Sequence, residues 1–226
     1  MNFYSDYVEN GTVYTDYEDL KKNFKIKVPE NFNFAYDIVD RYASLAPEKR
    51  ALVWCDDLGG EKIFNFKEIS EKSKQTANYL VKHGIKKGDT VMLILRRRYE
   101  FWYFILALHR IGAIAVPATN QLLTKDIEYR TNAAQIKMIV SYDDEPVQER
   151  IEAAMPVSPS VKELVTVGKA REGWQTFYAE LDAVSKEFDR PAGENATHNE
   201  DIMLLYFTSG TSGNPKMVEH NFAYPL

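Results

Sequence analysis

The chain has 226 residues and a mass of 26.0 kDa, enough for one large domain or a small pair at about 150 residues per domain. Hydrophobic residues make up 45% and charged residues 27%, a composition that excludes disorder as the main state. The net charge of −5 and the pI near 5.5 argue against a nucleic-acid partner.

The cysteine, histidine and hydropathy patterns indicate the cellular compartment and argue against a metal site and a membrane span. Cys55 is the single cysteine, so we expect a reducing compartment, the cytoplasm, and a small buried side chain on a strand. The four histidines lack zinc-site spacing, so no metal site is expected. The first residues do not resemble a signal peptide, and the most apolar segment, 101–108, is too short to span a bilayer.

The first 30 residues are rich in Tyr, Asn and Lys and predict an extension with at most a short helix near 16–25. A helix is expected from Asn33, a residue type that favours helix N-caps. Two strands at 51–55 and 62–66 flank a Gly-rich turn and predict a β-hairpin. A helix from residue 66 should then end at Gly84.

From residue 86 onward, strands and helices alternate. Strands are predicted at 90–95, 113–116, 136–141, 163–167 and 202–207. Helices are predicted at 99–110, 124–134, 145–154 and 174–188. The strands are continuous apolar runs, so we predict an α/β fold with a mostly parallel sheet covered by helices on both faces. Residues 101–104 should lie in the core, and residues 190–200 should form a linker.

A glycine-rich segment directly after the last strand is the most informative part of the chain. It holds two glycines, four hydroxyl residues and one lysine, which together suit the binding of phosphate. The residues expected to bind phosphate are Thr208, Ser209, Gly210, Thr211, Ser212, Gly213 and Lys216. Pro215 and Met217 replace the Gly and the Ser/Thr of a P-loop, which excludes that motif. The alternative is a surface turn that binds nothing.

Residues 205–216, LYFTSGTSGNPK, resemble the signature of the AMP-forming adenylating enzymes, which include acyl-CoA synthetases, peptide-synthetase adenylation domains and luciferases. Residues 110–119, 122–127 and 217–220 resemble the medium-chain or acetyl-type acyl-CoA synthetases. The resemblance begins near residue 31. It implies that a carboxylic acid reacts with ATP, with magnesium present, to give an acyl-adenylate, and that CoA then forms the thioester.

The resemblance also implies that residues 31–226 are an incomplete N-terminal adenylation domain. We expect the C-terminal domain that carries the family's catalytic lysine to be absent from these residues, so no catalytic residue is assigned and the fragment alone is expected to be inactive. Two further functional hypotheses stay open: an amino-acid adenylation domain that loads a carrier protein, and a non-catalytic nucleotide-binding module. The acyl chain length and the oligomeric state are not predicted.

Two other groups of residues are candidates for a site. His220 lies four residues after Lys216, one turn away if a helix begins there, and could face the nucleotide or the acyl group. Its alternative is a partly exposed structural histidine. Arg96, Arg97 and Arg98 follow a predicted parallel strand and could contact the phosphates of CoA, or could simply be a solvated helix entry.

Overall fold

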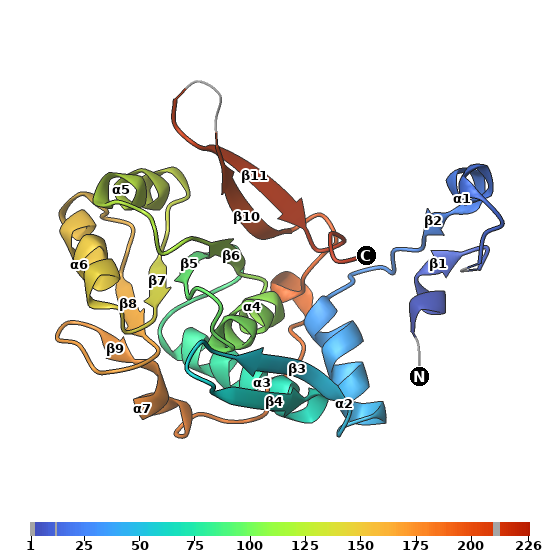
Figure 1. Ribbon diagram of the computed structural model, residues 1–226, viewed down its shortest axis with the longest axis horizontal. Coiled ribbons are helices and arrows are strands. Elements are labelled where there is room, and N and C mark those ends of the chain that lie inside the picture. The colour runs from blue at the N-terminus through green and yellow to red at the C-terminus, as the bar shows by residue number, and fades with distance from the viewer. Residues whose placement is uncertain (1–2, 12, 210–212) are drawn as a thin grey trace.

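The computed structural model describes residues 3–11, 13–209 and 213–226, which form a seven-stranded sheet and two small two-stranded sheets (Figure 1). The order of the large sheet is β11-β10-β6-β5-β7-β8-β9. Its strands are β5 (Thr90–Ile94), β6 (Ile114–Pro117), β7 (Met138–Ser141), β8 (Glu163–Thr166), β9 (Gln175–Thr176), β10 (Ile202–Thr208) and β11 (Lys216–Asn221). Neighbouring strands are parallel except for the antiparallel pair β10–β11. The predicted mostly parallel sheet is thereby confirmed.

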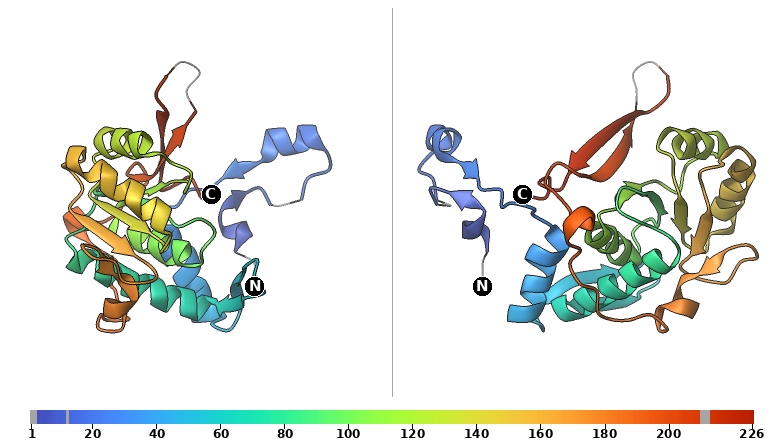
Figure 2. Two further views of the ribbon diagram at one scale, coloured as in Figure 1. Left: turned by 60° about the vertical axis from the view of Figure 1, so that its left-hand side comes forward. Right: turned by 180° about the vertical axis from the view of Figure 1, so that it is seen from behind.

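Helices cover both faces of this sheet. They are η2 (Ala35–Asp40), α2 (Arg41–Leu45), α3 (Phe66–Lys82), α4 (Glu100–Ile111), α5 (Thr124–Ala133), α6 (Glu145–Ala154), η3 (Met155–Val157), α7 (Phe177–Leu181) and η4 (Gly193–Asn195). The crossover through α4 joins β5 to β6, whereas the crossovers through α5 and α6 run in the opposite direction along the sheet. Right-handed crossovers therefore place α4 on one face and α5 with α6 on the other. Figure 2 shows this arrangement from two further sides.

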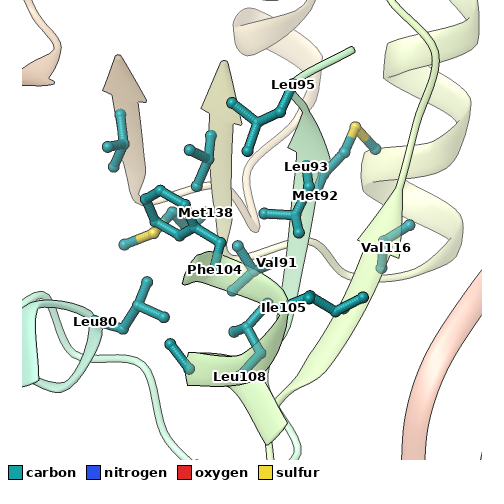
Figure 3. Packing of buried hydrophobic residues seen from close by; sticks show 14 of the residues in the cluster. Leu80, Val91, Met92, Leu93, Leu95, Phe104, Ile105, Leu108, Val116 and Met138 are labelled. Atoms are coloured by element: carbon teal, nitrogen blue, oxygen red, sulfur yellow. The ribbon is translucent and has the colours of Figure 1, made fainter. Parts of the chain in front are cut away.

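One part of the core lies between the sheet and the pair α3 and α4, and another lies under α5 and α6. Figure 3 shows Phe104 and Leu108 of α4 against Val91 of β5, with Leu80 of α3 beside them. All four side chains are fully buried. The five residues of β5 are buried on both faces, which explains why this strand is a continuous apolar run in the sequence.

Local signals set the ends of the helices around this core. Asn65 and Glu68 form a capping box at the start of α3, in which each side chain accepts a 2.8 Å hydrogen bond from the other's backbone N–H. At the end of α4, Gly112 has a φ of 80°, a left-handed conformation that glycine adopts without strain. The chain then turns directly into β6. These two ends fix where α3 and α4 meet the sheet.

The N-terminal segment lies to one side of the sheet (Figure 1). Its elements are η1 (Tyr4–Asp6), β1 (Val8–Glu9), α1 (Tyr17–Asn23) and β2 (Lys25–Ile26). Asp6 forms an ion pair with Arg41 at 2.7 Å, and the Tyr7 hydroxyl donates to the backbone carbonyl of Asp37 at 3.4 Å. The segment therefore contacts the molecule through η2 and α2.

The predicted hairpin is confirmed as β3 (Arg50–Cys55) and β4 (Glu61–Asn65), but some expectations are wrong. Cys55 is exposed, because this two-stranded sheet has a face open to solvent. Trp102 is 44% exposed on the outer side of α4, although Tyr103 and Phe104 are buried as expected. No described helix combines the length and apolar character needed to cross a membrane.

The helix predicted at 174–188 is also wrong, since only residues 177–181 form α7 and residues 175–176 form β9. The side-chain amide of Asn78 donates to the backbone carbonyls of Ser185 and Glu187, at 2.9 and 2.8 Å. These hydrogen bonds hold the segment after α7 in a non-helical path along α3.

Candidate nucleotide-binding site

The glycine-rich segment connects β10 to β11 at the tip of an antiparallel hairpin (Figure 1). β10 pairs in parallel with β6 at Leu204 and Ala115, so the segment follows the carboxyl end of a parallel strand, as predicted. Ligands of open α/β sheets bind beyond such ends. Of the residues expected to bind phosphate, Gly210, Thr211 and Ser212 lie outside the described residues. The others can be placed.

Thr208 and Lys216 mark the two ends of the segment and lie directly opposite each other in the strand pairing. The Thr208 hydroxyl donates to the backbone carbonyl of Lys216 at 3.4 Å. Gly213 has a φ of 125°, and an added Cβ there would meet no atom within 4 Å. Backbone conformation, not space, therefore requires glycine at this position.

The exposed groups of the segment suit a phosphate. Thr208, Ser209 and Lys216 are exposed, and Lys216 forms no ion pair with any residue in the described ranges. Its ammonium group is thus free to neutralise an anion. Residues 208–216 contain no Asp or Glu. The segment therefore offers hydrogen-bond donors to phosphate oxygens and no carboxylate ligand for magnesium. Within the described ranges, no three His, Cys, Asp or Glu side chains are grouped as they would be around a metal ion.

Helix α5 contacts both ends of the segment. The Tyr129 hydroxyl donates to the backbone carbonyl of Pro215 at 3.0 Å, and its ring meets the edge of Phe207 with 6.1 Å between centroids. The guanidinium of Arg130 lies 4.9 Å from the centre of the Phe207 ring. Burial lowers the pKa of Arg130 from its ordinary value. Sequence reasoning missed this contact, because no periodicity relates α5 to a segment 80 residues later.

His220 lies on β11, so the helical spacing considered for it and Lys216 does not apply. Four residues of strand separate it from Lys216, about 13 Å at the usual rise of a strand. Its half-buried ring packs against Tyr224, at 4.0 Å between centroids, and against the edge of Tyr206, at 5.7 Å. The structure thus places His220 away from the phosphate end of the hairpin, beside an open hollow of about 440 Å³.

The three consecutive arginines have different surroundings. Arg98 donates two hydrogen bonds, of 2.8 and 3.0 Å, to the buried carboxylate of Glu100 and is therefore structural. Arg97 is exposed, and its carbonyl accepts a 2.8 Å hydrogen bond from the Trp54 indole. Arg96 is exposed, has a φ of 48° and lies 5.9 Å from the Tyr142 ring at the carboxyl edge of the sheet. The structure therefore does not bring the three together as one basic site.

Taken together, the parallel sheet and a Ser/Thr/Gly/Lys segment beyond the end of one strand are features expected of an α/β protein that binds a phosphate-bearing ligand. The description "AMP-binding enzyme" matches residues 39–225. The chain belongs to this family of AMP-binding enzymes.

Several acyl-coenzyme A synthetases are similar to this chain over most of its length. The chain is 40% identical to rat acyl-coenzyme A synthetase ACSM2, mitochondrial, over 203 residues, which is 86% of this chain and 34% of the relative. It is 37% identical to rat ACSM5, mitochondrial, over 204 residues, or 87% and 34%. Against ACSM3, mitochondrial, of Pongo abelii it is 34% identical over 219 residues, or 92% and 36%. The chain thus spans about a third of the length of these relatives.

Solved structures share the fold. An anthranilate CoA ligase, AuaEII, in complex with anthranoyl-AMP superposes with a TM-score of 0.77 at 24% identity, covering 87% of this chain and 36% of that chain. An acyl-CoA synthetase of Brucella canis superposes with a TM-score of 0.71 at 25% identity, covering 84% and 33%. These superpositions confirm the predicted fold, which is that of the N-terminal part of adenylate-forming ligases.

Proposed function

We propose that this chain is the N-terminal portion of an AMP-forming acyl-CoA synthetase, in which residues 208–216 bind the phosphates of ATP. The protein would join a carboxylic acid to AMP, release pyrophosphate, and transfer the acyl group to CoA. Residues 31–226 would belong to its adenylation domain, with residues 1–30 as an extension. The observation that carries the proposal is the phosphate-type segment at the end of β10, in a chain related to acyl-coenzyme A synthetases over most of its length.

The chemistry of the segment follows from its donors. When a carboxylate oxygen attacks the α-phosphorus, the bond to the pyrophosphate breaks and negative charge grows on that leaving group. The Ser209 hydroxyl can donate to its oxygens, the Thr208 hydroxyl can do so by exchanging its long 3.4 Å bond to the Lys216 carbonyl for a phosphate oxygen, and the Lys216 ammonium can neutralise the charge. Thr211 and Ser212 are proposed to donate in the same way, with Gly210 and Gly213 giving the backbone its shape. Magnesium bound with ATP would neutralise further phosphate charge.

Substrate and compartment remain matters of proposal. The relatives are named acyl-coenzyme A synthetases, which supports a carboxylic acid and CoA as substrates over an amino acid and a carrier protein. Their names also place them in mitochondria, so they do not support the expected cytoplasmic location. We propose no catalytic residue in this chain. His220 is a candidate residue of the acyl or nucleotide site, and mutation of His220 would test that role.

The experiment that tests the function is ATP–pyrophosphate exchange by the full-length protein. The panel of acids runs from acetate through medium-chain and aromatic acids to amino acids, with CoA added afterwards. We expect exchange with a fatty or aryl acid, followed by CoA-dependent release of AMP. Exchange with amino acids alone would replace the proposal with a carrier-loading enzyme. Binding of ATP without exchange for any acid would leave a non-catalytic nucleotide-binding module.

A further inference from the structure

The arm that carries the glycine-rich segment receives little support from the sheet itself. β10 pairs with β6 at Leu204, four residues before Thr208, and from Leu204 to Thr208 it also pairs with β11. Figure 1 shows this hairpin rising from the edge of the sheet beside α5. A two-stranded hairpin on its own is marginally stable in water. The position of its outer ends, at Thr208 and Lys216, therefore depends on contacts from outside the hairpin.

Helix α5 supplies such contacts at the outer ends of both strands of the hairpin, β10 and β11. Phe207, which Tyr129 and Arg130 contact, directly precedes Thr208. Pro215, whose carbonyl accepts the hydrogen bond from Tyr129, directly precedes Lys216. One side chain of α5 thus fixes the residue before the first hydroxyl and the residue before the lysine.

From this geometry we infer that Tyr129 is a positioning residue, which holds the two ends of the phosphate-binding segment in place through Phe207 and Pro215. The inference rests on the proposed function for its effect on ATP, but the contact itself can be tested without activity. Because the Tyr129 hydroxyl and ring act on different arms, Tyr129→Phe removes the contact to Pro215 and keeps the contact to Phe207. A net hydrogen bond changes an equilibrium by about two- to tenfold.

The first test measures amide hydrogen exchange in the 226-residue chain. We expect the amides of Asn214, Lys216 and Met217 to exchange about two- to tenfold faster in Tyr129→Phe than in the wild type. Tyr36→Phe is the matched control, because the Tyr36 hydroxyl also donates to a backbone carbonyl, that of Arg110, at 3.3 Å. It should leave those three amides unchanged. Equal exchange in Tyr129→Phe and the wild type would overturn the inference.

The second test uses ATP–pyrophosphate exchange by the full-length protein. We expect Tyr129→Phe to raise KM for ATP and for pyrophosphate about two- to tenfold and to leave KM for the acid unchanged, because the segment faces the phosphates. A purely structural role would change the KM values for ATP and for the acid alike. Equal changes in these two KM values would therefore overturn the inference. If the wild type exchanges with no acid, the proposed function fails, and the amide-exchange result still decides the role of Tyr129.

Discussion

Thr208 and Lys216 face each other across the β10–β11 hairpin, with the threonine hydroxyl on the lysine carbonyl. The pairing brings the residue with the first hydroxyl of the glycine-rich segment opposite the residue that carries its cation, although eight positions separate them in the sequence. The chain between them must therefore reverse direction within a few residues. Gly213, with its φ of 125°, lies in that reversal.

Gly213→Ala tests whether this backbone conformation matters for ATP. Alanine is strained at this φ, so we expect weaker ATP binding, with a KM for ATP raised about tenfold, and little change in global stability. Gly59→Ala is the matched control, since Gly59 also has a positive φ, 85°, and free space around it, but lies in the turn between β3 and β4. Steady-state kinetics of both variants of the full-length protein, with their melting temperatures, give the comparison. An equal KM in the two variants would contradict the assignment of the segment.

A buried ion pair joins η2 to α4 and carries a second prediction. The Arg110 guanidinium is fully buried and donates to both carboxylate oxygens of Asp40, at 2.6 and 2.8 Å. Burial is the largest single effect and raises the pKa of Asp40, but the hydrogen bonds and charge of Arg110, a hydrogen bond from Ser70 and the charge of Lys74 together hold it below its ordinary value. Asp40→Asn would leave the buried cation without its counter-charge. We expect a loss of about 3–5 kcal/mol in unfolding free energy, measured by urea denaturation.

The control for Asp40→Asn is Asp6→Asn. It breaks the ion pair between Asp6 and Arg41, which has a similar distance of 2.7 Å but side chains 47% and 39% exposed. An exposed pair contributes at most about 1 kcal/mol. Similar losses in the two variants would show that burial does not govern the strength of the Arg110–Asp40 pair.

His109 gives the chain a specific sensitivity to acid. The residue is 5% exposed, and neither ring nitrogen has a hydrogen-bond partner among the described residues. Burial, with a smaller effect from Arg110, lowers the pKa of His109 from 6.5 to about 3. The unfolded chain therefore binds a proton that the folded chain does not bind between about pH 6.5 and pH 3. Stability from this group is present above pH 6.5 and is lost as the pH falls, by about 2 kcal/mol at pH 5.

His109→Leu should remove this acid sensitivity. We expect its unfolding free energy to fall by about 2 kcal/mol less than that of the wild type between pH 7 and pH 5. Phe222→Leu is the control, because Phe222 packs near the His109 ring, at 6.1 Å between centroids, and keeps the titrating group. That variant should lose stability at both pH values and retain the pH dependence of the wild type. A parallel fall in His109→Leu and the wild type would refute this account.

The buried strands and the position of the glycine-rich segment could be predicted, because parallel strands covered on both faces are apolar runs and ligand loops follow their ends. The helix ends at Asn65 and Gly112 also depend on local residues. What could not be predicted depends on distant partners. The Asn78 side chain donates to the backbone carbonyl of Ser185, 107 residues later, and holds the segment after α7 out of a helix. The Tyr129 hydroxyl donates to the carbonyl of Pro215, 86 residues later. Neither contact has a local signal in the sequence.

The strand after the segment was missed for a related reason. Residues 216–221 have no strict alternation, and their partner β10 determines their extended form through paired backbone hydrogen bonds. His220 therefore lies opposite Leu204, far along the strand from Lys216. A role for His220 at the phosphates is not supported by this placement, whereas the segment from Thr208 to Lys216 keeps the geometry that its residues suggest.

The most direct measurement is ATP–pyrophosphate exchange by the full-length protein with Lys216→Ala beside the wild type, using the acid that gives the fastest exchange. Lys216 is exposed and forms no described ion pair, so its loss should leave the melting temperature nearly unchanged. We expect the exchange rate to fall by about 10²-fold or more, because the charge that grows on the leaving pyrophosphate loses its cation. Thr211→Ala should lower the rate as well. Undiminished exchange in both variants would contradict the claim that this segment binds the phosphates of ATP.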